Sequence, residues 1–300
     1  MADGTAFLQA LGRVARLYAP AAQRVYEAHR DVCSWLLGPL ERWTLAAYGA
    51  ETFDRAARGY AEYCLHVSKS QKHYETEGRY ATQDVGEVFD DVYDNPDYMT
   101  GYMWAAILVY AFWPSMITHI ELYRDAFLAE LPEECRMLEL ACGHGVMGLL
   151  AAEYRPGLRT TGFDISPTAI DIAAHLAEAS GLAERAEFVV RDVLNPAAQG
   201  EPHGYQGVLA AMVAEHLAEP RKLFASVAHH LAEDGLAFVG NAIESAQSDH
   251  VYEFHQESEA VLMAEEVGLR VVRLISDRGQ PIRGGRFVPR AQAMILEHRR

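Results

Sequence analysis

The stretch MLELACGHGVMG, residues 137–148, decides the fold because it joins a short apolar run to a glycine-rich turn. Gly143, Gly145 and Gly148 have the spacing G-x-G-x-x-G, which is typical of a strand-to-helix loop that approaches dinucleotide phosphates. Glu139, however, places an acid four residues before the first of these glycines. A carboxylate there would repel a phosphate, so the glycine spacing alone does not identify the ligand.

The overall composition indicates an ordinary globular protein. The 300 residues are 50% hydrophobic and 23% charged, enough for one large domain or two smaller ones. A formal net charge of −16 disfavours nucleic acid as a partner, because phosphates need a basic surface. The most apolar run, 102–116, is short for a membrane span and contains Pro114, so we expect a buried helix and a turn. Without a basic and apolar leader at the N-terminus, the sequence predicts a cytoplasmic protein with no membrane contact.

The chain changes character near residue 132. Upstream, apolar residues recur at helical spacing, as in 6–18 and 51–67, which predicts about five to seven helices. Downstream, strand-like runs alternate with helical stretches, the pattern of a doubly wound sheet. We therefore predict an α/β fold: a Rossmann-like seven-stranded sheet and an all-helical N-terminal cap. We also expect the last strand to be antiparallel, a direction that the alternating pattern does not determine. The expected domains are the cap, 1–132, and the sheet domain, 133–300. The seven expected strands span 136–140, 158–163, 186–190, 205–211, 236–241, 269–275 and 291–297.

Ser166 and Pro167 predict the start of the helix after the second strand, with serine as the N-cap and proline at the first helical position. The four cysteines show no C-x-x-C spacing, so we expect reduced, buried thiols: Cys33, Cys64, Cys135 and Cys142. No cluster of histidines and carboxylates with metal-ligand spacing can be assembled from the sequence, and no metal is predicted.

Acidic residues end the first three expected strands. Glu139 closes the first, Asp164 the second and Asp192 the third. In open α/β sheets, ligands bind beyond the carboxyl ends of the strands, near the point where the strand order reverses. Three carboxylates at this place suit a cationic ligand with hydroxyl and amine groups. S-adenosylmethionine is such a ligand.

The segment LELACGHG, residues 138–145, resembles the first motif of the class I S-adenosylmethionine-dependent methyltransferases. The resemblance covers roughly 136–297 and includes YQGVLAAMVAEHL, 205–217, which looks like the fourth motif of that superfamily. It implies that Glu139 organises the amino-acid end of the cofactor, that Asp164 holds the ribose and that Asp192 accepts from the adenine amine. The residues expected at the cofactor are Glu139, Ala141, Gly143, His144, Gly145, Asp164, Ile165, Asp192, Val193, Met212, Tyr93 and Tyr102.

Two positions depart from the pattern of that superfamily. Ala141 replaces the usual first glycine, and alanine serves there where the backbone torsion is not positive. Gln206 stands where many relatives have an acid at the start of the fourth strand, which argues against a catalytic carboxylate there.

The remaining candidates concern the acceptor and the proton. The segment 90–104 is aromatic and is expected to close over the site as a lid, because aromatic faces attract a sulfonium. Glu215 and His216 follow the fourth strand, where the histidine could take a proton and the acid could orient it. The catalytic candidates are His216, Glu215, Tyr98 and His250. The substrate-binding candidates are Tyr98, Trp104, Asn241, Tyr252, Glu253 and His255.

The sequence leaves several functions open. We expect methyl transfer to a small molecule of specialised metabolism, with S-adenosylhomocysteine as the second product. Attack on the γ-carbon of the cofactor would instead make the chain an aminocarboxypropyl transferase or cyclase, as in azetidine-2-carboxylate or nicotianamine-like chemistry, and would release methylthioadenosine. A non-catalytic cofactor-binding module and a nicotinamide enzyme are also compatible with the sequence. An exposed aromatic face on the helix near 104–113 would support a homodimer.

Overall fold

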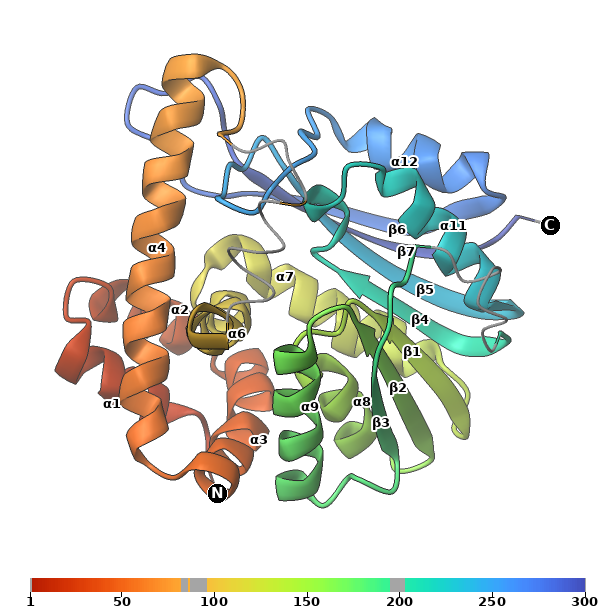
Figure 1. Ribbon diagram of the computed structural model, residues 1–300, viewed down its shortest axis with the longest axis horizontal. Helices are drawn as coiled ribbons and strands as arrows, with labels where there is room; N and C mark the ends of the chain where they lie inside the picture. The colour runs from red at the N-terminus through yellow and green to blue at the C-terminus, as the bar shows by residue number, and fades with distance from the viewer. Residues whose placement is uncertain (1, 82–85, 87–95, 195–202, 300) are drawn as a thin grey trace.

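The sequence forms a helical region beside a seven-stranded sheet in the computed structural model, which describes residues 2–81, 86, 96–194 and 203–299 (Figure 1). The described helices of the N-terminal region are α1 (Thr5–Val14), α2 (Ala19–Ala28), α3 (Arg30–Tyr48), α4 (Glu51–Glu77), α6 (Pro96–Phe112) and α7 (Pro114–Leu122), followed by the π-helical segment η2 (Tyr123–Leu128). The expected helical character of the N-terminal region is therefore confirmed. The division into domains at residue 132 stays a prediction.

The sheet has the strand order β3-β2-β1-β4-β5-β7-β6. Its strands are β1 (Cys135–Leu140), β2 (Leu158–Asp164), β3 (Ala186–Val190), β4 (Tyr205–Ala211), β5 (Leu231–Ile243), β6 (Leu269–Arg278) and β7 (Arg290–His298). The first five strands pair in parallel, whereas β7 is antiparallel to both β5 and β6. The predicted seven-stranded sheet with an antiparallel last strand is confirmed.

The strand order reverses at β1, which lies between β2 and β4. The glycine loop leaves β1 at this switch point and enters α8 (Val146–Tyr154). The helix after β2 is α9 (Pro167–Ser180), whose N-cap Ser166 accepts a hydrogen bond from the Ala169 N–H, as predicted. Helices α11 (Pro220–His230) and α12 (Glu257–Glu266) supply residues to a second apolar cluster with the sheet. The glycine loop therefore lies at the carboxyl end of the parallel strands, between β1 and the first covering helix, α8.

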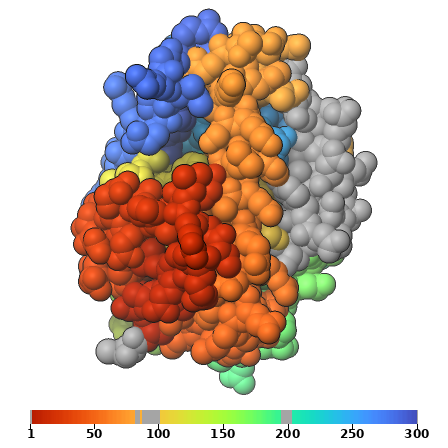
Figure 2. Space-filling model, turned by 90° about the vertical axis from the view of Figure 1, so that its left-hand side faces the viewer, coloured from red at the N-terminus to blue at the C-terminus, as the bar shows by residue number. Residues whose placement is uncertain are grey.

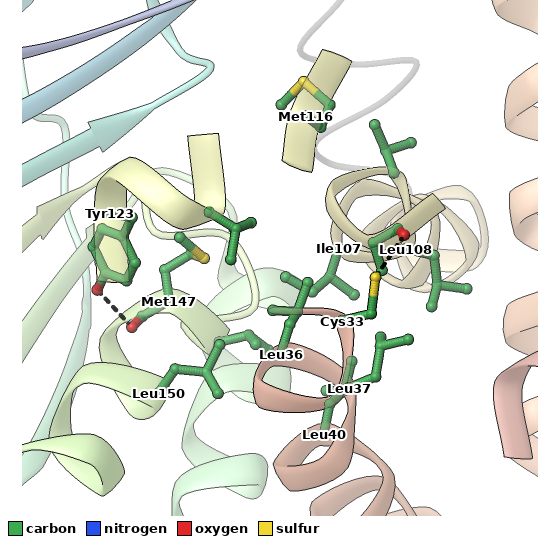
Figure 3. Close-up of a cluster of buried hydrophobic side chains, with 14 of the residues drawn as sticks. Cys33, Leu36, Leu37, Leu40, Ile107, Leu108, Met116, Tyr123, Met147 and Leu150 are labelled. Carbon is green, nitrogen blue, oxygen red and sulfur yellow. Dashed lines mark hydrogen bonds between the residues drawn. The ribbon is translucent and has the colours of Figure 1, made fainter. Parts of the chain in front are cut away.

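The main hydrophobic core joins the helical region to the sheet domain. In Figure 3, side chains of α3, including Leu36 and Leu37, point toward Ile107 of α6 and Leu150 of α8. The Tyr123 hydroxyl donates to the Met147 carbonyl oxygen at 2.9 Å, which ties η2 to the first turn of α8. Because one buried cluster spans both regions, the helical region is packed directly against the sheet domain rather than attached by a loose linker.

Most side chains of α6 between residues 101 and 112 are apolar and buried. Trp104 is only 4% exposed and packs edge-on against Tyr48 at 6.0 Å between ring centroids. The expectation of an exposed aromatic face near 104–113 is wrong, because this helix fills the interior of the helical region. The run 102–116 forms the predicted buried helix and turn, with α6 ending at Phe112 and α7 starting at Pro114.

Among the residues described, no single helix has the length and apolar character to cross a membrane, although 101–112 and 114–128 meet that test together as a pair bent by 87°. The four cysteines, all in the described part of the chain, are free and buried, as expected.

Helix α4 runs along one side of the molecule beside α1 and α2 (Figure 2). Its C-terminal end is held by the connection between β6 and β7. Tyr74 stacks on Phe287 at 3.9 Å between ring centroids, and the Glu75 carboxylate accepts from the backbone N–H groups of Arg286 at 2.7 Å and Phe287 at 2.8 Å. The helical region is therefore fastened to the sheet domain at a second place, far along the chain from the first.

Helices α4 and α6 approach closely at two glycines. A Cβ atom on Gly59 would lie 2.7 Å from the backbone oxygen of Gly101, whereas a Cβ on Gly12 of α1 would have no neighbour within 4 Å. Gly12→Ala should raise the free energy of unfolding by about 0.5–1 kcal/mol through helix propensity. Gly59→Ala should lower it by about 1–3 kcal/mol, because the two helices must separate. Urea denaturation of both variants checks this difference in sign, and equal effects would contradict the packing.

Candidate active site

A cavity of about 670 Å³ lies between the glycine loop and the helical region. Its walls at the strand ends include Glu139, Ala141, Gly143, Asp164, Ile165, Asp192, Val193 and Met212. Its walls in the helical region include Tyr18, Tyr60, Tyr63, Val67, Tyr102, Tyr110, Trp113 and Met116. The volume is within the range of cofactor and small-molecule sites, about 300–1,000 Å³.

Glu139 is buried at the end of β1, and one of its oxygens accepts from the Gly148 N–H at 2.9 Å. A Cβ on Gly148 would lie 2.9 Å from that same oxygen and 2.7 Å from Thr160 Oγ1, so only glycine fits there. Burial raises the pKa of Glu139 to about 8, with Asp164 adding to the shift and the Gly148 N–H opposing it. The third glycine of the motif therefore holds an acid in place, and a phosphate-binding role is not needed to explain it.

Asp164 organises the glycine loop. Its two oxygens accept from the backbone N–H groups of Gly143 and Ser166, each at 2.8 Å. Burial raises the pKa of Asp164, and these two N–H groups oppose the shift. Each carboxylate oxygen can accept more than one hydrogen bond, so Asp164 retains acceptor capacity toward the cavity that it lines.

The glycine loop requires left-handed backbone at three positions. Gly143 has φ +52° and Gly145 has φ +65°, as glycine allows. Ala141 has φ +53°, so the expectation of a torsion that is not positive is wrong. An alanine in this conformation costs roughly 1 kcal/mol, which the fixed ends of the loop must offset. Gly145 lies outside the cavity lining and packs instead beside the Phe188 ring, where a Cβ would clash.

His144 also lines the cavity, at the turn of the loop. Its Nδ1 accepts from the Val146 N–H at 3.1 Å, so the proton of the neutral ring is on Nε2. Burial lowers the pKa of His144 to about 4, and the ring is neutral near pH 7. Asp192 is more exposed and accepts from the Leu194 N–H at 2.9 Å while lining the same cavity.

A second group of polar residues lines the cavity beyond the carboxyl ends of β4 and β5. Glu215 and His216 form the 3₁₀ turn η3 (Ala214–His216), and His250 comes from the loop after β5. The rings of His216 and His250 lie 4.8 Å apart between centroids, nearly perpendicular. The loop is held there by the Glu215 carbonyl oxygen, which accepts from the N–H groups of Val251 at 2.8 Å and Tyr252 at 3.0 Å. Residues distant in sequence are thus brought to one wall.

Asp249 supports this group, although nothing in the sequence pattern predicted it. It is buried, and its carboxylate accepts from the Tyr102 hydroxyl at 2.7 Å and lies 3.4 Å from His216 Nδ1. Burial alone would raise the pKa of Asp249, but His216, His250 and the Tyr102 hydroxyl together lower it below its usual value. Asp249 therefore joins Tyr102 of the helical region to His216 at the end of β4.

Several predicted substrate contacts lie elsewhere. Trp104 points into the helical core, two residues from Tyr102 and on the opposite side of α6. Asn241 is fully buried inside β5 and is absent from the cavity lining. Tyr252 packs against Phe254 at 4.7 Å between ring centroids. All three therefore lie outside the cavity lining: Trp104 and Asn241 are buried in packed interiors, and Tyr252 is partly buried beside Phe254.

Glu253 and His255 are also outside the cavity lining. Glu253 accepts from the Tyr80 N–H at 2.6 Å, whereas His255 is exposed and donates its backbone N–H to Glu259 at the start of α12. Tyr93 lies outside the described residues. Tyr98 belongs to α6, but its side chain is outside the described part.

Aromatic residues of the helical region line the cavity without having been predicted from the sequence. Tyr60 and Tyr63 of α4, Tyr110 of α6 and Trp113 between α6 and α7 all contribute to the wall, and Trp113 Nε1 donates to the Tyr60 hydroxyl at 3.1 Å. Their helical spacing is visible in the sequence, but buried core residues have the same spacing. Only the tertiary structure shows which aromatic residues line the cavity and which pack in the core.

Glu139 provides a pH-dependent test of this site. The folded protein holds the Glu139 proton up to about pH 8, whereas an ordinary glutamate releases it near 4.5. The unfolded chain therefore binds fewer protons between these values, and Glu139 makes stability fall as pH rises through them. Glu139→Gln keeps an acceptor for the Gly148 N–H but cannot ionise. Its free energy of unfolding relative to the unmodified protein should rise with pH, by at most about 1.4 kcal/mol per unit.

Urea denaturation at pH 5, 6.5 and 8 measures this slope. Glu184→Gln, at an exposed position, is the matched control and should show no such trend. A pH-independent difference for Glu139→Gln would contradict the burial of an ionisable group at this position.

Comparison with known proteins agrees with this architecture. A family model described as a methyltransferase domain matches residues 138–237. No protein of curated function matches the sequence. The structure is similar to the mitomycin 7-O-methyltransferase MmcR, with 16% identity over 88% of this chain and 74% of that one, and a TM-score of 0.54. It is also similar to the YcgJ protein of Bacillus subtilis, with 17% identity over 61% of this chain and 99% of that one, and a TM-score of 0.50.

At these identities the structural likeness concerns the fold alone. The match to the methyltransferase domain, however, covers the second half of β1, the glycine loop, Asp164 at the end of β2 and Asp192 just after β3. The seven strands and the antiparallel last strand are those predicted from the sequence. Residues 138–237 thus match a methyltransferase domain, and the whole sheet has the fold of S-adenosylmethionine-dependent methyltransferases, which together support an S-adenosylmethionine-dependent transferase.

Proposed function

We propose that this enzyme transfers the methyl group to a small, largely apolar acceptor bound among the aromatic side chains of the helical region. The observation that carries the proposal is that one cavity is walled on one side by the glycine loop and on the other by Tyr60, Tyr63, Tyr110 and Trp113. A cofactor at the strand ends and an acceptor among these rings would share a continuous space. Direct transfer requires such an arrangement.

The cofactor side is the acidic one. Glu139, Asp164 and Asp192 are the proposed partners of the amino-acid end, the ribose and the adenine amine. A cationic ligand beside Glu139 favours the ionised carboxylate, which offsets the effect of burial. His144, neutral and buried in the loop, is proposed to cover the cofactor rather than to exchange protons.

The acceptor side is apolar and enclosed. The helices α4, α6 and α7 supply most of its wall, which favours a small molecule over a polymer that would need an open surface. The net charge of −16 also argues against nucleic acid. The helical region, 1–132, is therefore proposed to bind the acceptor and the sheet domain, 133–300, the cofactor. Specialised metabolism, cytoplasmic residence and a homodimer stay predictions.

The chemistry requires alignment and removal of a proton. S-adenosylmethionine supplies a methyl group activated by a sulfonium, and the nucleophile forms its bond to that carbon as the carbon–sulfur bond breaks and its electron pair returns to sulfur. The protein must hold the nucleophile in line, exclude water and accept the proton that the nucleophile loses. Glu215, His216 and His250 form the polar wall against which we place the reacting atom of the acceptor.

Product analysis tests this function. The enzyme should convert S-adenosylmethionine to S-adenosylhomocysteine only when a suitable acceptor is present, and a panel of aromatic alcohols, amines and polyketide-like acids would reveal that dependence by mass spectrometry. Release of methylthioadenosine without an acceptor would overturn the proposal in favour of aminocarboxypropyl transfer or cyclisation. Binding of S-adenosylhomocysteine without turnover of any compound in the panel would favour a binding module.

Val67 tests the position of the acceptor. Val67 of α4 lines the cavity, whereas Leu65 of the same helix is 47% exposed and lies outside the lining. Val67→Trp should raise the KM for the acceptor at least about tenfold, since it fills space that the acceptor needs. The affinity for S-adenosylhomocysteine, measured by calorimetry, should stay within about twofold of its original value. Leu65→Trp should change neither quantity. Loss of cofactor affinity in Val67→Trp would place the cofactor, not the acceptor, beside α4.

A further inference from the structure

We propose that Glu215, His216 and His250 form a binding site for a divalent transition-metal ion in the wall of the cavity. A potential ligand atom of each side chain lies within 4.8 Å of the others, and all three residues line the cavity. The sequence suggested no metal site, because His250 stands 34 positions after His216 and comes beside it only through the fold. Two imidazoles and one carboxylate are the ligand set of many catalytic zinc and non-haem iron sites.

The carboxylate of Glu215 is the first independent observation. Its side chain is 1% exposed, and neither oxygen has a hydrogen-bond partner of normal geometry among the described residues, although the backbone N–H groups of Glu215 itself and Ala242 face the carboxylate. A buried carboxylate without such partners costs several kcal/mol if ionised, by an order-of-magnitude estimate. A divalent cation beside it would remove that cost and supply the missing interaction.

The orientation of the two imidazoles is the second observation. His250 Nδ1 lies 2.7 Å from the Ser245 carbonyl oxygen, and His216 Nδ1 lies 3.0 Å from the Asp249 carbonyl oxygen. A carbonyl oxygen only accepts, so both Nδ1 atoms bear a proton. Nε2 is therefore the atom through which each neutral ring would bind a metal. Metal-binding histidines usually donate their other ring N–H in this way.

The backbone holds the three ligands together. The Glu215 carbonyl oxygen accepts from the N–H groups of Val251 and Tyr252, which joins η3 to the loop that bears His250. Ligand atoms around a bound zinc or iron ion lie at about 2.0–2.2 Å from it and hence about 3 Å from one another. The side chains must therefore draw together by rotation, while the backbone clamp stays in place.

Charge and access fit such an ion. The buried Asp249 has a carboxylate oxygen 3.4 Å from His216 Nδ1, so the carboxylates of Asp249 and Glu215 would both lie close to the charge of +2. Three protein ligands leave positions open toward the cavity. If the proposed function holds, an acceptor hydroxyl would take one of these positions and lose its proton more readily beside the metal. We expect an acceptor whose nucleophile is an oxygen.

Cobalt titration tests the site without substrate or cofactor. Full-length protein, treated with a chelator and dialysed, should bind one Co²⁺ per chain and develop visible d–d absorption. Glu215→Gln and His250→Ala should each weaken Co²⁺ binding more than about 100-fold, since loss of a direct ligand exceeds the typical 10–100-fold cost of losing an outer partner. His255→Ala, which removes a nearby exposed histidine outside the lining, should bind Co²⁺ unchanged.

The affinity of each variant for S-adenosylhomocysteine reports on folding. A variant that keeps its affinity for S-adenosylhomocysteine but loses Co²⁺ absorption supports the metal site. If Glu215→Gln binds Co²⁺ as tightly as the unmodified protein, the proposal is overturned. If Glu215→Gln does not fold, two other measurements test the site. His250→Ala should lose Co²⁺ absorption, and Zn²⁺ added to the unmodified protein should displace Co²⁺; failure of either would overturn the proposal. Absence of Co²⁺ absorption in the unmodified protein also overturns it.

Methyl transfer is measured separately, so that the two proposals fail independently. Full activity in chelator-treated protein would overturn the role of the metal in transfer and leave the proposed function intact. If the protein shows Co²⁺ absorption but never forms S-adenosylhomocysteine, the metal site is supported and the proposed function is rejected.

Discussion

Two buried carboxylates at the ends of neighbouring strands are the constraint on which the cofactor side of this protein depends. Glu139 and Asp164 cannot be placed in the interior unless backbone N–H groups meet them, and Gly148, Gly143 and Ser166 supply these groups. The same contacts fix the course of the glycine loop. The hydrogen bonds that these two carboxylates require therefore determine the shape of the proposed cofactor site. The loop keeps this conformation even at Ala141, where a positive φ is unfavourable.

The local features of the sheet domain could be predicted because each depends on a few adjacent residues. The strand-to-helix transition at Ser166 and Pro167 follows from hydrogen-bond capping and a fixed backbone torsion. The strands followed from short apolar runs, although β5 begins earlier and β6 ends later than expected. The antiparallel last strand came from the resemblance to a superfamily, since no local pattern determines strand direction.

The site could be predicted only where the chain itself determines it. Glu139 and Asp164 follow directly from strand ends, and both line the cavity. By contrast, Tyr102 and Trp104 differ by two residues on one helix, and their sequence neighbourhood gives no indication that one faces the cavity and the other the core. The contact between Glu215 and the loop of His250 joins the turn after β4 to the loop after β5. Such placement is a property of the assembled sheet and not of any short segment.

The two walls of the cavity come from different parts of the chain. The strand ends and the glycine loop make one wall, and α4, α6 and α7 make most of the other. Substitutions in the helices can therefore reshape one half of the cavity while the two acids and their N–H partners stay as they are. Under the proposed function, changes in the helical sequence alone could alter which acceptor binds, while the sheet domain would present the same methyl donor to each new acceptor.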